Sequence, residues 1–176
     1  MSLPRLTGGT VDLLCGGIAH IEAEGRDVAE LCAMLGVRVP PQWPPEHNDE
    51  NTRAWFISGL TEYPGSEPWW VYYVILHDDG GDVLVGGAGF TGPPQDNEVE
   101  IGYAILPQYQ RRGLASAAVG MLVANAFERG VTKVKANTLA DGVASQGVLT
   151  KCGFIKTGET VDPDEGAVWS FAVERA

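Results

Sequence analysis

The chain has 176 residues, 44% of them hydrophobic, which is enough for one folded domain with an apolar core and excludes a disordered chain. The formal net charge of −11 disfavours nucleic acid and anionic membranes as partners. The first residues lack the apolar core of a signal peptide, no apolar run has the length of a membrane span, and the three cysteines match neither a disulfide framework nor a zinc site, so we expect a cytoplasmic protein.

The first third of the chain predicts a short strand followed by three helices. Asp27 is the expected N-cap of the second helix, Glu30 stands where a capping box requires an acidic side chain, and Gly36 ends the helix. The four prolines of Val39–Pro45 exclude both a helix and a central strand, and they leave Trp43 on a stiff loop as an exposed candidate. The predicted strand is Thr10–Leu14, and the predicted helices are Ile18–Glu24, Asp27–Leu35 and Asp49–Leu60.

The middle of the chain changes to strand periodicity. Aromatic and β-branched runs separated by turn-forming residues predict three consecutive antiparallel strands. A Gly-x-Gly-x-x-Gly match begins at Gly87, but Pro93 and Pro94 follow it where a dinucleotide fingerprint needs a helix, so we interpret it as a closely packed strand end. The predicted strands are Trp69–Leu76, Val83–Phe90 and Glu98–Leu106, and the first two form a hairpin through the turn at His77–Asp82.

The last part of the chain alternates helices and strands. A long helix with small residues is predicted over Gly113–Arg129, a strand over Val131–Thr138 and a second helix over Ala144–Lys151. An extended piece over Phe154–Thr157 and a last strand over Trp169–Val173 follow. Antiparallel strands followed by this alternation predict an α/β fold with a mixed (α+β) sheet, and not a Rossmann fold.

The net charge is the sum of two unequal parts. Residues 1–100 hold 16 acidic against 4 basic residues, whereas residues 101–176 hold 7 against 8. Within 106–157 there are seven basic and two acidic residues, so an anionic ligand is expected there. An uneven scatter of solvated charges gives the same counts, and charge alone does not separate these two interpretations.

The segment Gln110–Ala115 is the best candidate for an anion site. It lies between the end of a predicted strand and the start of a predicted helix, where free backbone N–H groups and the helix dipole favour a pyrophosphate. Gly113 lets a ligand approach the backbone, Ala115 avoids a side-chain clash, and Arg111 and Arg112 add positive charge. Taken alone, a helix start with solvated arginines is the simpler interpretation.

Two stretches of the sequence together resemble a known family. Val99–Pro107 followed by Gln110–Ala115 resembles the acetyl-CoA-binding core of the GNAT N-acetyltransferases, whose loop signature is Gln/Arg-x-x-Gly-x-Gly/Ala. Ser145–Phe154 is similar to the helix and Gly-Phe ending of that family, especially in its RimJ/RimL-like branch of ribosomal-protein N-terminal acetyltransferases. The resemblance implies the GNAT acyl-CoA N-acyltransferase fold, with mostly antiparallel N-terminal strands followed by β-α-β-α-β and a V-shaped splay. It also implies a single domain of residues 1–176, whose cofactor-binding core is about 70–155.

The resemblance further implies a cofactor site. In the family, the pantetheine arm of acetyl-CoA lies in the splay and makes main-chain hydrogen bonds as an added strand does. Backbone amides near Ile105 and Leu106 would meet the pantetheine, and those of Arg111–Ala115 and Ser116 the pyrophosphate. Asn137 is a polar candidate beside the same cleft. The implied cofactor-binding residues are Ile105, Leu106, Gln110, Arg111, Arg112, Gly113, Leu114, Ala115, Ser116, Asn137 and Ser145.

Candidate catalytic residues follow from the chemistry of amine acetylation. An ammonium group must lose a proton before it attacks a thioester, and Glu98 and Glu100 lie two residues apart, on one face of an extended strand. Glu100 aligns with a glutamate of the family and is the first choice of base, although solvent-facing charges explain both residues equally well. Many members carry a Tyr four residues before the Gly of Gly-Phe, where this chain has Leu149. Ser145 matches a serine that contacts the CoA sulfur or pantetheine, and its alternative is a helix N-cap.

The resemblance therefore implies an acetyl-CoA-dependent N-acetyltransferase that transfers the acetyl group directly to a primary amine in a ternary complex. The acidic first 100 residues favour a cationic acceptor, such as a protein N-terminus, a polyamine or an aminoglycoside. Leu149 and Gly142, which stand where a Tyr and an Asn are customary, support an alternative: a CoA-binding regulatory or interaction module with little turnover. The scattered histidines predict no metal site, and we expect a monomer or a homodimer.

Overall fold

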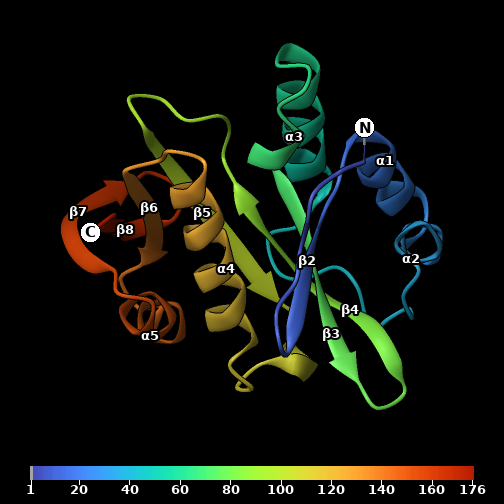
Figure 1. Cartoon of the computed structure of the whole chain (residues 1–176). Coiled ribbons are helices and arrows are strands. Elements are labelled where there is room, and N and C mark those ends of the chain that lie inside the picture. The colour runs from blue at the N-terminus through green and yellow to red at the C-terminus, as the bar shows by residue number, and fades with distance from the viewer. Residues whose placement is uncertain (1) are drawn as a thin grey trace.

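The structure is a computed structural model that describes residues 2–176. An eight-stranded mixed sheet has the order β1-β2-β3-β4-β5-β6-β8-β7, with β5 and β6 parallel and the other neighbours antiparallel (Figure 1). The predicted mixed α/β fold is confirmed. The strands are β1 (Arg5–Leu6), β2 (Val11–Cys15), β3 (Val71–Asp78), β4 (Gly81–Phe90), β5 (Glu98–Ile105), β6 (Lys133–Leu139), β7 (Ile155–Asp162) and β8 (Gly166–Glu174). The helices are α1 (Ile18–Arg26), α2 (Val28–Leu35), α3 (Glu50–Glu62), α4 (Leu114–Glu128) and α5 (Val143–Lys151), with short 3-10 turns at Glu67–Trp69 and Pro107–Tyr109.

Helices cover both faces of this sheet, α4 and α5 on one face and α1 to α3 on the other (Figure 1). Successive side chains of a strand point to opposite faces, and β3 shows the consequence. Tyr72 and Val74 pack in the buried cluster that includes α4, whereas Tyr73 and Ile75 pack in the cluster that includes α1, α2 and α3. The central strand is therefore apolar at almost every position, which explains the unbroken hydrophobic run seen in the sequence.

Helix ends follow the predicted caps, with one exception. Asp27 accepts a hydrogen bond from the Ala29 amide at the start of α2, and Gly36 ends that helix in a left-handed conformation. Glu30 does not complete the predicted capping box, because its carboxylate pairs instead with Arg26 one turn earlier. Capping needs only local geometry, which is why the sequence pattern predicts most of these boundaries.

Several other expectations need correction. Trp43 is half-buried and packs against the α1–α3 cluster, because its ring covers apolar surface that the proline loop passes over. Trp69 ends a 3-10 turn before β3 begins, because Pro68 within that turn cannot donate to a strand ladder. The strand predicted over Phe154–Thr157 starts one residue later and extends to Asp162 as the edge strand β7. The predicted close packing of β4 is confirmed at Gly89, where an added Cβ would lie 1.9 Å from the Trp70 carbonyl oxygen.

Among residues 2–176, no helix combines the length and the apolar character that a membrane span requires. This finding covers every helix named above.

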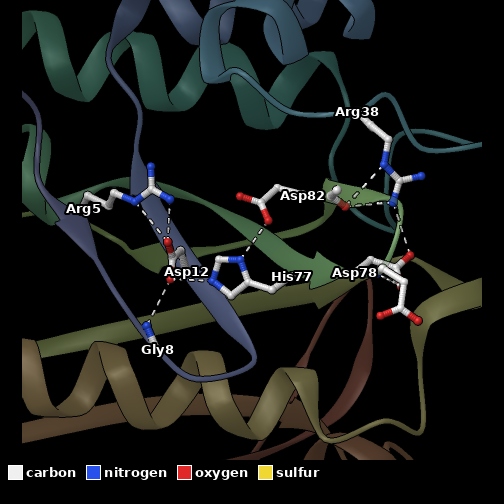
Figure 2. Close-up of polar contacts among 9 residues, drawn as sticks. Arg5, Gly8, Asp12, Arg38, His77, Asp78 and Asp82 are labelled. Carbon is white, nitrogen blue, oxygen red and sulfur yellow. Dashed lines mark hydrogen bonds and ion pairs between the residues drawn. The ribbon is translucent and has the colours of Figure 1, made fainter.

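A network of charged side chains ties β2 to the hairpin of β3 and β4 (Figure 2). The His77 ring lies between two carboxylates, with Nε2 2.9 Å from Asp12 Oδ1 and Nδ1 2.9 Å from Asp82 Oδ1. Asp12 is only 3% exposed and also accepts hydrogen bonds from Arg5 and from the Gly8 amide. Burial raises the pKa of Asp12, but these hydrogen bonds outweigh it and lower the pKa overall. The hydrogen bonds to Asp82 and Asp12 raise the pKa of His77.

This network makes stability depend on pH. The folded state binds the His77 proton more tightly than the unfolded chain does, so the stabilisation is complete below the unfolded histidine pKa of about 6.5 and is lost as the pH rises through the higher folded value. We expect the difference in melting temperature between the wild type and His77→Gln to be largest near about pH 6 and to shrink toward about pH 9.

The variant Asp82→Asn serves as the control, because it keeps the imidazole and removes one of its two carboxylate partners. Its melting temperature should fall less steeply with pH than that of the wild type. If the difference in melting temperature between the wild type and His77→Gln stays constant or grows from about pH 6 to about pH 9, the role of His77 is contradicted.

Candidate active site

The parallel pairing of β5 and β6 is short. It runs from the pair Glu98 and Lys133 to the pair Ile101 and Ala136, after which the two strands separate. Beyond that point β5 continues to Ile105 beside β4, and β6 continues to Leu139 beside β8. The sheet therefore has a gap between β5 and β6, as the V-shaped splay predicts.

Backbone polar groups of β5 face this gap. Glu100 and Leu106 exchange hydrogen bonds with β4, through Thr91 N–H to Glu100 O and Leu106 N–H to Val85 O, at 3.0 and 2.8 Å. Backbone directions alternate along a strand, so Tyr103 and Ile105 point their N–H and C=O groups toward β6, which is no longer paired there. The expected ligand contact through the Leu106 amide is wrong, because that N–H is bonded to β4, whereas the Ile105 amide faces the gap.

The loop between β5 and α4 is shaped by two left-handed residues. Arg111 has φ 64° and Gly113 has φ 77°, and Gly113 is the N-cap of α4. A left-handed conformation is uncommon for a residue with a side chain, and it turns successive amides toward a common side. Gln110 fastens the loop to the strand, because its Nε2 donates to the Ile105 carbonyl oxygen at 2.9 Å. The free N–H groups at the start of α4 thus lie at the end of the β5–β6 gap.

A cleft of about 1200 Å³ brings most of the predicted cofactor residues together. Lys151 of α5 also lines it and adds a second basic side chain to that of Arg111. Arg112 and Leu106 do not line it, and the Arg112 guanidinium lies over the Tyr109 ring instead, 5.9 Å from the ring centroid. The predicted cofactor residues that line the cleft are Ile105, Gln110, Arg111, Gly113, Leu114, Ala115, Ser116, Asn137 and Ser145.

Ser145 forms a hydrogen bond with Tyr103, a residue that the sequence motifs alone do not mark as functional. The N-cap of α5 is Gly142, so the alternative of Ser145 as N-cap is wrong. Its Oγ lies 2.8 Å from the Tyr103 hydroxyl, which also donates to the Ser145 carbonyl oxygen at 3.2 Å. Burial raises the pKa of Tyr103, so the phenol keeps its proton at neutral pH. Leu149 is fully buried in the core, and the phenols that line this cleft are those of Tyr103 and Tyr109. Tyr103 follows Glu100 by three residues in the Glu-Ile-Gly-Tyr motif. On an extended strand this spacing places its side chain on the opposite face from Glu100, and that alternation is the sequence signal that indicates its side of the sheet.

The two candidate bases lie on β5, beside the cleft and not in its lining. Glu98 has its carboxylate 3.2 Å from the Lys135 ammonium and 3.8 Å from that of Lys133. Glu100 accepts a hydrogen bond from Asn137 Nδ2 at 3.0 Å, and Asn137 in turn accepts one from Ser170. Asn137 therefore connects the cleft lining with the Glu100 carboxylate.

A second cavity of about 240 Å³ adjoins the cleft on the α1–α3 face of the sheet. Both cavities are lined by Tyr103 and Ala104 of β5 and by Glu46, His47 and Thr52. Gly102 and Ala104 line its floor, and Glu100 is the next residue along β5 on that same face. Two ligands, one in each cavity, would meet beside Tyr103.

Comparison with known proteins agrees with this geometry. A family model described as an acetyltransferase (GNAT) domain matches residues 20–155, which is well over half of the chain. The uncharacterized N-acetyltransferase YjdG of Bacillus subtilis (strain 168) is 35% identical over 155 residues, which is 86% of each chain. The chain therefore belongs to the GNAT family, and it is an acetyltransferase, as the sequence motifs predict.

Two solved structures share the fold at low identity. An acetyltransferase of Salmonella typhimurium that modifies the N-terminal serine of a 50S ribosomal subunit protein has a TM-score of 0.68 at 17% identity, over 98% of this chain and 100% of that one. RimJ of Mycobacterium smegmatis, in complex with a CoA-disulfide, has a TM-score of 0.67 at 17% identity, over 98% of this chain and 86% of that one. The GNAT fold and the resemblance to RimJ and RimL are thus confirmed.

GNAT acetyltransferases use acetyl-CoA, and the cleft fits this ligand. The backbone groups of Tyr103 and the amide of Ile105 face the gap and suit the amides of a pantetheine arm, which pair as an added strand does. The amides of Gly113–Ser116 and the positive end of α4 suit a pyrophosphate. No group of three or more His, Cys, Asp or Glu side chains that could hold a metal ion occurs in the described part of the chain.

Gly113 offers a direct test of this site. An added Cβ there meets no protein atom within 4 Å, but φ is left-handed, so valine strains the backbone and projects into the space beside the amides. We expect Gly113→Val to weaken acetyl-CoA binding roughly 100-fold or more, as measured by calorimetry, because several charge-assisted hydrogen bonds are lost. The melting temperature should fall by only a few degrees.

Gly120→Val is the matched control, since Gly120 lies on the exposed side of α4 with open space around it. It should bind acetyl-CoA as the wild type does. Unchanged affinity in Gly113→Val would remove the loop from the cofactor site.

Proposed function

We propose that this protein transfers an acetyl group from acetyl-CoA directly to a primary amine while both are bound. The observation that carries the proposal is the meeting of two cavities at Tyr103 and Ala104, one matching the cofactor and one open to an acceptor. Direct transfer requires the thioester and the amine side by side, and adjoining cavities provide that proximity. We take residues 1–176 to act as one domain, because strands from both halves of the chain share the sheet.

In this proposal each part of the cleft has a task. The Tyr103 and Ile105 backbone and the Gln110 side chain hold the pantetheine arm, and the amides of Arg111–Ser116 hold the pyrophosphate. The Arg112 side chain, outside the lining, contributes only long-range positive charge. When bound, acetyl-CoA supplies the activated acyl carbon and a thiolate leaving group.

Glu100 is the proposed base. It shares a strand face with the floor of the acceptor cavity, and its hydrogen bond from Asn137 leaves the other carboxylate oxygen to take a proton, directly or through a water. The ion pairs of Glu98 with two lysines make it the weaker choice.

Tyr103 is the proposed proton donor, and Ser145 is proposed to position its hydroxyl. The phenol keeps its proton because burial raises its pKa, and its hydrogen bond to Ser145 fixes the position of the hydroxyl. As the C–S bond breaks, the Tyr103 O–H transfers its proton to the leaving thiolate, and Ser145 orients the phenol. This pair would do the work of the tyrosine that many family members carry where this chain has Leu149.

The acceptor is proposed to be cationic. Sixteen acidic residues lie in the first 100 positions, and the acceptor cavity is lined by Glu24 and Glu46 against the single basic side chain of Arg53. A protein N-terminus is one candidate class, since the Salmonella neighbour modifies an N-terminal serine. A small cationic amine is the other, because the acceptor cavity is only about 240 Å³.

The test is release of free thiol from acetyl-CoA on addition of amines. We expect release only when an amine is present, preferring cationic acceptors, and we expect Glu100→Gln to lower kcat by about 100-fold or more. The defect should shrink at about pH 10, where more of the acceptor is already neutral and needs no base.

Glu98→Gln removes the same charge two residues away on β5 and should keep most of the activity. If acetyl-CoA binds tightly but no amine in a panel of peptides, polyamines and aminoglycosides releases thiol, the chain is a CoA-binding module and the proposal is wrong. A pH-independent defect in Glu100→Gln would instead remove only its role as base.

A second test addresses the proton donor. Tyr103→Phe keeps the ring and removes the hydroxyl, so kcat should fall by about tenfold or more while the KM for acetyl-CoA changes little. Ser145→Ala keeps the phenol and should cause a smaller loss. A kcat for Tyr103→Phe within about twofold of the wild type would contradict the assignment.

A further inference from the structure

A buried carboxylate, that of Glu24, lines the acceptor cavity. Glu24 of α1 is 8% exposed, and its Oε1 accepts hydrogen bonds from Trp43 Nε1 at 3.0 Å and Asn48 Nδ2 at 2.6 Å. The Tyr73 side chain also forms a hydrogen bond with this carboxylate. Burial raises the pKa of Glu24, and the hydrogen bonds from Asn48 and Trp43 and the charge of Arg53 counteract that shift. A carboxylate so placed is stabilised by a further cation.

A buried hydroxyl lines the same cavity beside this carboxylate. Tyr73 is only 2% exposed. Burial raises the pKa of Tyr73, and the charge of Glu24 and the hydrogen bond with it raise that pKa further. Glu24 and Tyr73 therefore form one polar pair at this end of the cavity, and an ammonium group suits the negative charge of that pair.

The floor of the cavity connects this pair with the β5–β6 gap. Tyr73 pairs with Gly87, and Gly87 pairs with Ala104, so the three residues lie side by side across β3, β4 and β5. Gly87 and Gly102 leave the floor open, since an added Cβ meets nothing nearer than 3.9 Å at Gly87 and nothing within 4 Å at Gly102. Two strand spacings, about 10 Å, therefore separate Tyr73 from the strand that borders the gap.

This separation determines which part of a bound acceptor lies within reach of Glu24. A general base must lie within hydrogen-bond reach of the reacting amine, directly or through one water. An amine that attacks at the gap is too far from Glu24 for that, so Glu24 faces the other end of the acceptor. The cavity between the gap and Glu24 is lined by Trp43, Trp55 and Phe56. These side chains suit an apolar chain, and the π faces of their rings also suit a cation.

We infer that Glu24, together with the Tyr73 hydroxyl, is a specificity site for a second positive charge, and that the preferred acceptors are diamines with an apolar spacer. The inference rests on the proposed function, because it places the reacting amine at the gap. Arg53 also lines the cavity, but Glu24 and Glu46 leave the lining net negative when His47 is neutral.

The test compares hexamethylenediamine with hexylamine, which has the same carbon chain and one charge. With the full-length wild type, kcat/KM should be at least about tenfold higher for the diamine, as a charge-assisted hydrogen bond implies. In Glu24→Gln, which keeps a carbonyl oxygen for Trp43 and Asn48, the two amines should become nearly equivalent through a rise in the KM for the diamine. Tyr73→Phe should lower the preference less.

Glu22→Gln is the matched control, because Glu22 lies on the exposed side of α1 two residues away, and it should keep the wild-type preference. Calorimetry of the protein with CoA and each amine provides a readout independent of turnover. Equal binding of the two amines by the wild type, or a preference unchanged in folded Glu24→Gln, overturns the inference. Thiol release that is the same for both amines refutes this specificity site alone, whereas absence of release with every amine refutes the proposed function.

Discussion

The end of the parallel ladder between β5 and β6 is the constraint on which the rest of the structure depends. Pairing stops at Ile101 and Ala136, so the backbone groups of Tyr103 and Ile105 have no strand to bond. Unpaired backbone groups inside a sheet are unfavourable unless water or a ligand satisfies them. An extended amide chain satisfies them best, and the start of α4 at the end of the gap supplies N–H groups for an anion.

The charged side chains of the cleft are unevenly placed along it. Arg111 and Lys151 lie toward α4 and α5, whereas Glu46, Asp49, Asp141 and Glu165 also line the cleft. The proposed place of the pyrophosphate is therefore the start of α4, where the free backbone amides and Arg111 lie. The overall charge of −11 conceals this uneven placement, because the basic segment 106–157 lies within an acidic chain.

The sequence predicts what local chemistry determines. Caps such as Asp27, the three-strand run and the loop at Gln110–Ala115 depend on neighbouring residues, and all appear in the structure. The two-residue β1 is too short to show a period, and β7 is exposed along nearly its whole length, so no apolar alternation marks its end. Glu24 and Tyr73 are far apart in the chain and meet only because α1 packs on β3. Tertiary packing of that kind leaves no pattern in a single sequence.

A crystal structure with CoA tests the central claim most directly. The account predicts that the pantetheine arm lies between β5 and β6, hydrogen-bonded to the backbone of Tyr103 and Ile105, with the pyrophosphate on the amides of Gly113–Ser116. CoA bound at any other place, or β5 and β6 paired along their whole length in the complex, would contradict it.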